Sequence, residues 1–94
     1  MIPNCPPFQL GRVVATQGAL AACLRSGDMP ADFVRRHERG DWGAICPEDW
    51  LKNDAALKSG LRIVSAFDLK DGERIWIITE ADRSATTLLL PDEY

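Results

Sequence analysis

The sequence predicts a single α+β domain over residues 1–94, in which an N-terminal strand and three helices precede a three-stranded antiparallel meander. Two observations favour this class. Residues 61–90, LRIVSAFDLKDGERIWIITEADRSATTLLL, contain three runs rich in β-branched and aromatic residues, separated by turn-forming residues. Residues 16–60 instead place apolar residues at helical spacing, and glycines interrupt this pattern where helices are expected to end.

The first fifteen residues lead into the domain. Residues 1–7, MIPNCPP, contain three prolines and predict an irregular lead-in. Residues 8–15, FQLGRVVA, predict a short strand because Val13 and Val14 have high strand propensity. The sequence leaves open whether this strand pairs at an edge of the sheet or packs across it.

Two helices are expected next. Thr16 is a suitable N-cap for a helix over QGALAACLRS, and Gly27 ends that helix. A second helix begins at Asp28 or Met29 and ends at Gly40. One face of this second helix carries Phe33, Val34 and His37.

The third helix has the clearest start and stop signals. Cys46-Pro47 opens it, Glu48 and Asp49 lie where the helix dipole favours negative charge, and Gly60 ends it. We expect its apolar stripe to consist of Trp50, Leu51, Ala55 and Leu57.

Asp71-Gly72 predicts a two-residue hairpin loop, because a type I′ turn needs positive φ at both central residues. This register places Phe67 opposite Trp76, an aromatic pair that sheets favour. A second reversal over residues 81–84 places Leu89 opposite Trp76 as well.

Both faces of the resulting sheet are apolar, because side chains alternate between faces along each strand. We expect the helices to pack on the face that carries Phe67, Trp76 and Ile78. The other face would carry Ile75, Ile77 and Leu88, and needs a cover of its own. The N-terminal segment, a second copy of the chain or another protein could supply that cover.

Composition argues against several classes of function. The formal net charge of −3 argues against general nucleic-acid binding, which usually requires a basic surface. Three widely spaced cysteines, without a C-x-x-C pair, favour free thiols over a disulfide framework or a zinc site. The absence of a leader or a long apolar run predicts a soluble cytoplasmic protein that does not bind membranes.

Residues that could support catalysis are few, and we expect no enzyme activity, cofactor or metal. His37 is the single histidine, and its helix offers no second ligand at metal-binding spacing. It is expected at the edge of the core. Glu80, Asp82 and Arg83 cluster near a turn, where they could act as acid and base, or simply form a polar turn.

Two surfaces are candidates for binding a partner. The first is a basic cluster on the second helix, although a solvated helix face with internal ion pairs would explain that cluster as well. The other is the apolar second face of the sheet. The corner that follows the second helix adds a tryptophan, which is expected to fill the core. The candidate residues are Arg35, Arg36, Arg39, Asp41, Trp42, Ile75, Ile77 and Leu88.

Two runs, RHERGDWG at residues 36–43 and WIITEADRSATTLLLPDEY at residues 76–94, resemble short uncharacterised bacterial proteins described as plasmid-related. The resemblance extends over most of the chain from Leu10 onward and assigns no site. It implies a setting on mobile genetic elements, which commonly carry small acidic proteins that block host defences.

These observations together favour a non-enzymatic protein-binding accessory factor, acting as an inhibitor of a host defence system or pairing with itself as a homodimer. The alternative is a small nucleic-acid-binding regulator that uses Arg35, Arg36 and Arg39. An enzyme built on the turn at residues 80–83 is the third hypothesis.

Overall fold

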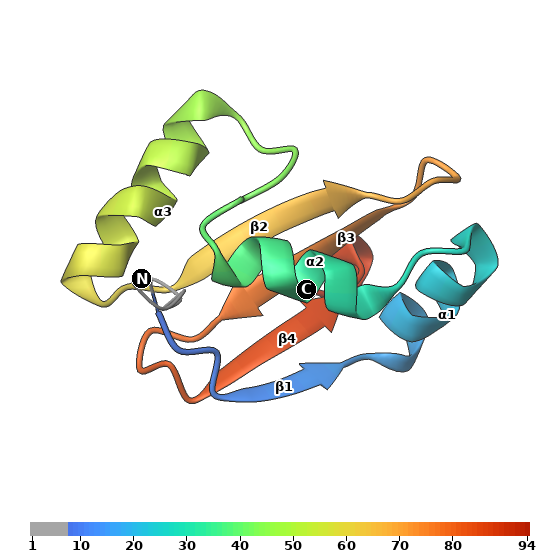
Figure 1. Cartoon of the computed structure of the whole chain (residues 1–94), viewed down its shortest axis with the longest axis horizontal. Helices are drawn as coiled ribbons and strands as arrows, with labels where there is room; N and C mark the ends of the chain where they lie inside the picture. The colour runs from blue at the N-terminus through green and yellow to red at the C-terminus, as the bar shows by residue number, and fades with distance from the viewer. Residues whose placement is uncertain (1–7) are drawn as a thin grey trace, which may run out of the picture.

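The computed structural model describes residues 8–94, so the predicted irregular lead-in at residues 1–7 lies outside the described residues. The elements follow one another in the predicted order (Figure 1), which confirms the α+β class. They are β1 (Arg12–Ala15), α1 (Gln17–Ser26), α2 (Pro30–Glu38), α3 (Pro47–Ser59), β2 (Ile63–Asp68), β3 (Arg74–Thr79), β4 (Ala85–Leu89) and a short 3₁₀ helix, η1 (Pro91–Glu93).

The four strands form one sheet in the order β1-β4-β3-β2. Strands β2, β3 and β4 make the predicted antiparallel meander, while β1 pairs in parallel with β4. The N-terminal strand therefore pairs at an edge, which decides between the two placements left open by the sequence.

The predicted register between β2 and β3 is wrong by one residue. Phe67 pairs with Ile75, and Trp76 pairs with Ala66. The loop has three residues rather than two: the Gly72 amide donates to the Leu69 carbonyl at 3.0 Å, and Gly72 then adopts φ 90°. A type I turn followed by a left-handed glycine replaces the type I′ turn. The second predicted register, with Leu89 opposite Trp76, is confirmed.

This shift of one residue moves Phe67 and Trp76 to opposite faces of the sheet. The face covered by α1 and α2, here called the helix face, carries Ile63, Ser65, Phe67, Ile75, Ile77, Thr79, Thr86 and Leu88. Ile75, Ile77 and Leu88 were expected on a second, partner-binding face, and that prediction is wrong. Their exposed fractions are 0%, 0% and 2% because they form the main core with α1 and α2.

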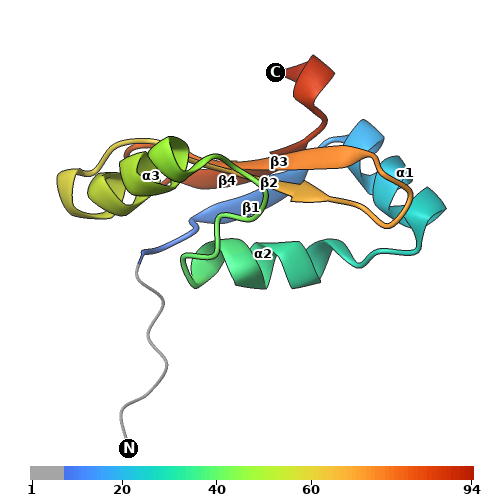
Figure 2. The same cartoon turned by 90° about the horizontal axis from the view of Figure 1, so that it is seen from above.

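The opposite face, here called the η1 face, is not the one that α1 and α2 cover. Figure 2 shows α2 on one side of the sheet and the C-terminal residues on the other. The Tyr94 ring lies edge-on to the Trp76 ring, with 5.5 Å between centroids. The prediction that Trp76 and Ile78 pack against the helices is therefore wrong. The side chains on this face include Val64, Ala66, Trp76, Ile78, Thr87 and Leu89.

Helix α3 lies beside β2 and turns a different stripe inward from the one predicted. Trp50 and Leu57 pack against a second apolar cluster, as expected, but Leu51 is 68% exposed and Ala55 is exposed. The inward stripe instead centres on Asn53, because its side chain bonds the β2 backbone. The second cluster consists of Phe8, Trp42, Ala56 and Ile63.

Candidate functional site

His37 lies inside the core rather than at its edge. It is fully buried, and the rings of Phe8 and Trp42 lie edge-on to it at 5.3 and 5.6 Å. Its Nδ1 lies 2.5 Å from Ser65 Oγ, and its Nε2 lies 2.8 Å from Thr79 Oγ1. Burial lowers the pKa of His37 to about 4, so the imidazole is neutral near pH 7.

The hydrogen-bond chain around His37 fixes its tautomer. Thr86 Oγ1 donates to the Leu10 carbonyl at 2.7 Å, and its hydroxyl therefore accepts from Thr79. Thr79 has then used its one proton and must accept from Nε2–H of His37, which leaves Nδ1 to accept from the Ser65 hydroxyl. Every member has its partner inside the protein. The chain therefore joins α2 to β2, β3 and β4 and presents no group to a substrate.

The turn at residues 80–83 is held from within as well. Arg83 adopts φ 61°, and its guanidinium donates to the carbonyls of Leu61 and Ala56 at 2.7 and 3.0 Å. Hydrogen bonding with Ser84 lowers the pKa of Asp82, and the Ser84 amide donates to Asp82 Oδ1 at 3.0 Å. Glu80 joins the turn through its carbonyl, which accepts from the Arg83 amide at 2.9 Å. Arg83 thus ties this turn to the end of α3.

Two of the three arginines predicted to bind a partner form ion pairs within the protein. Arg35 pairs with Asp32, and Arg36 Nε donates to Asp41 at 2.8 Å. The Arg36 guanidinium also lies over the Phe67 ring, 4.7 Å from its centroid. Arg39 has no ion pair with any of residues 8–94. The positive potential of the arginine cluster is therefore mostly cancelled by the neighbouring carboxylates.

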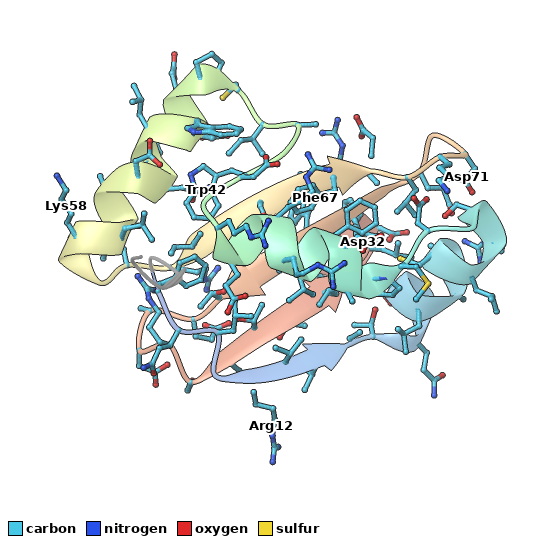
Figure 3. The ribbon with its side chains drawn as sticks, viewed as in Figure 1. Arg12, Asp32, Trp42, Lys58, Phe67 and Asp71 are labelled. Carbon is cyan, nitrogen blue, oxygen red and sulfur yellow. The ribbon has the colours of Figure 1, made fainter. Side chains whose placement is uncertain are left out.

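The corner at Asp41 and Trp42 is a structural feature. Trp42 is fully buried, as predicted, and its indole Nε1 donates to Asp54 at 3.0 Å. Figure 3 shows its ring beside β2. Asp41 Oδ1 accepts from the Gly43 amide at 3.0 Å. Burial alone would raise the pKa of Asp41, but the hydrogen bonds from Arg36 and Gly43 outweigh it and lower the pKa.

The two edges of the sheet differ in how they are covered. At the β2 edge, the Ala66 amide donates to the Trp42 carbonyl at 3.2 Å, and the Ala66 carbonyl accepts from Ala44 at 2.7 Å. The Asn53 side chain likewise bonds both the amide and the carbonyl of Val64. At the β1 edge, nothing among residues 8–94 bonds the outward N–H and C=O groups of Val13 and Ala15. An open edge of this kind is a template for pairing with another strand.

A shallow apolar groove of about 370 Å³ runs between β1 and α2 beside this open edge. Val13 and Val14 are 46% and 41% exposed. We call the combined feature the β1 edge surface, which consists of Val13, Val14, Ala15, Ala31 and Val34. This surface was not among the binding sites predicted from the sequence. The Val13-Val14 pair, in a strand for which an edge position was one of the two placements left open, was the signal that could have indicated it.

A second groove, of about 480 Å³, lies on the η1 face between α3 and Trp76. Its cations already have partners: Arg74 pairs with Asp68 at 2.9 Å, and Arg62 donates to the Tyr94 hydroxyl. Over residues 8–94, no three His, Cys, Asp or Glu side chains lie where they could hold a metal ion. The groove therefore offers mixed polar and apolar contacts. Lys52 and Arg74 have ion pairs, whereas the partner of Arg62 is a neutral hydroxyl.

Comparison of the chain with protein-family models, curated proteins and solved structures gave no match. Within the part of the chain that the structure describes, every helix is too short or too polar to cross a membrane.

Proposed function

We propose that the protein is a non-enzymatic protein-binding accessory factor that takes up an extended strand of its partner along β1. The observation that supports this function is the β1 edge surface. There the Val13 and Ala15 backbone groups point outward beside an apolar groove. Strand addition uses this combination, because main-chain hydrogen bonds supply affinity and the adjoining groove selects the side chains.

The charges around the β1 edge surface also suit protein binding. Asp32 neutralises Arg35 at the rim of the groove, and Val34 and Ala31 supply its apolar floor. The mobile-element setting implied by the resemblance would make a host-defence protein one suitable partner, and a second copy of the chain is the other. The alternative, a nucleic-acid regulator using Arg35, Arg36 and Arg39, has less support because phosphate binding needs several cations that are not already paired.

Site-specific photo-crosslinking tests the proposed function. A photoreactive phenylalanine analogue is placed at Val13, and a matched control carries it at Leu51, an exposed apolar residue on α3 at the other edge of the sheet. Both variants are expressed in cells that carry the gene naturally. We expect discrete protein adducts on illumination from position 13 and none from position 51. Adducts of equal yield from both positions, or from neither, would contradict the proposal.

A further inference from the structure

We propose that the partner of the β1 edge surface is a second copy of this chain, joined by antiparallel pairing of the two β1 strands about a two-fold axis at Val14. This inference rests on the proposed function, since it names the partner. Its test is separate, because a second copy can be distinguished from any other protein by mass.

The backbone of β1 sets the register of this pairing. The Arg12 amide donates to the Ser84 carbonyl at 3.0 Å, and the Thr16 amide donates to the Leu88 carbonyl at 2.9 Å. The backbone N–H and C=O groups of the even-numbered residues therefore point to β4, and those of Val13 and Ala15 point outward. With Val14 opposite itself, Val13 lies opposite Ala15 of the second copy. Each such pair exchanges two hydrogen bonds, which gives four in total.

The same register makes the charges at the two ends of β1 complementary. Arg12 and Thr16 point to the η1 face, where Thr16 Oγ1 donates to Glu93 Oε1 at 2.7 Å. Glu93 Oε2 accepts no hydrogen bond from residues 8–94, and in that range Arg12 has no ion pair. Figure 3 shows Arg12 pointing away from the sheet at the free edge.

Antiparallel pairing brings Arg12 opposite Thr16 of the second copy, and therefore close to that copy's Glu93, which Thr16 holds through Oε1. Hydrogen bonds from the Leu90 amide and from Thr16 lower the pKa of Glu93, so its carboxylate stays charged. The two-fold axis repeats the contact, giving two ion pairs. An unrelated strand would have to bring both charges at the right spacing, whereas this chain already carries them.

Apolar contacts on both faces support the same arrangement. The two Val14 side chains meet on the η1 face, in a pair without mutual hydrogen bonds, where side chains approach closely. On the helix face, each Val13 lies opposite Ala15, and the two grooves lined by Val34 become continuous across the axis. A two-fold axis perpendicular to the sheet keeps equivalent faces on the same side.

The pairing also closes the assembly at two copies. The joined sheet has the order β2-β3-β4-β1 in one copy, followed by β1-β4-β3-β2 in the other. Both outer edges are therefore β2 strands. Asn53 and the chain at Trp42 and Ala44 already occupy those edges. Further strands therefore cannot add, and a discrete dimer results rather than a fibre.

Charge exchange tests the dimer. We compare the wild type, Arg12→Glu and Glu93→Arg by light scattering after size exclusion and by sedimentation, each over a range of concentrations. The wild type should have the mass of a dimer. Each variant alone juxtaposes like charges twice and should dissociate with a Kd raised roughly tenfold or more. An equal mixture of the two variants restores both opposite-charge pairs and should recover the dimer.

Circular dichroism checks that each variant is folded, and Val14→Lys provides a second way to break the interface. A wild type that stays monomeric at millimolar concentration overturns the second-copy proposal. So does a dimer that neither Val14→Lys nor the charge variants weaken, or a mixture that fails to recover. A monomer that still crosslinks another protein through position 13 leaves the proposed function standing. A monomer without such adducts removes both proposals.

Discussion

The Asn53 side chain accepts a hydrogen bond from the Val64 amide at 3.2 Å and donates one to the Val64 carbonyl at 2.7 Å. A side-chain amide on α3 thus takes the place of a neighbouring strand at the β2 edge. Its presence explains why the sheet has one closed edge and one open edge, and why the candidate binding surface lies at β1 rather than at β2.

Replacing Asn53 with leucine should lower the free energy of unfolding by about 2 kcal/mol or more. The change leaves the Val64 amide and carbonyl without partners in a partly buried setting, and such a loss costs about 1–3 kcal/mol where the group is fully buried. Urea denaturation measures the effect. Lys52→Leu is the control, because Lys52 is exposed and adjacent on α3. Equal stability of the two variants would show that the hydrogen bonds of Asn53 do not stabilise the edge.

Gly43→Ala should destabilise the protein more than Gly60→Ala. Both glycines have positive φ, 75° and 71°, so both alanines carry the cost of a left-handed residue, roughly 1–2 kcal/mol. At Gly43 the new Cβ would also lie 2.1 Å from the Ala66 carbonyl oxygen, whereas at Gly60 nothing lies within 4 Å. We expect a difference of about 1–3 kcal/mol in the free energy of unfolding. Similar losses would mean that the chain at Gly43 moves away from β2 without cost.

The order of elements could be predicted from the sequence because its signals are local. Thr16 caps α1 through its side chain, and Gly27 and Gly60 end α1 and α3 in left-handed conformations. Each of these effects depends on residues within one turn. The turn at residues 81–84 also gave the correct register between β3 and β4.

The faces of the sheet and the binding surface could not be predicted in the same way. Asp71-Gly72 is compatible with a two-residue loop and with a three-residue loop that ends at Gly72, and the choice between them inverts the faces of β2 relative to β3. The inward stripe of α3 follows from its position beside β2, which depends on the long-range contact of Asn53 with Val64. Such contacts leave no local pattern in the sequence.

Arg83→Lys should lower the free energy of unfolding by about 1–3 kcal/mol. The guanidinium bonds the carbonyls of Leu61 and Ala56 through two different nitrogens, at 2.7 and 3.0 Å, whereas lysine has a single nitrogen, so we expect it to keep only one of these bonds. Arg25→Lys is the control, because Arg25 forms an exposed ion pair with Glu73 and should change stability by less than about 0.5 kcal/mol. Thermal and urea unfolding measure both. A lysine variant as stable as the parent would contradict the role of Arg83 as a clamp.

The burial of His37 predicts a dependence of stability on pH. The folded protein holds the His37 pKa at about 4, below the value of 6.5 expected in the unfolded chain. Between these values the unfolded chain binds a proton that the folded protein excludes. The free energy of unfolding should therefore be highest above pH 6.5 and fall as the pH falls toward 4, by up to about 3 kcal/mol from this residue alone.

His37→Gln isolates that contribution. Glutamine can donate to Thr79 and accept from Ser65 but does not titrate, while carboxylates such as Asp41 and Asp82 lose their own contributions at low pH in both proteins. The difference in unfolding free energy between the two proteins, measured in urea at pH 7.5, 6 and 5, should shrink steadily as the pH falls. A difference that stays constant over this range would show that His37 takes up its proton equally well in the folded protein. The buried hydrogen-bond chain would then tolerate an imidazolium.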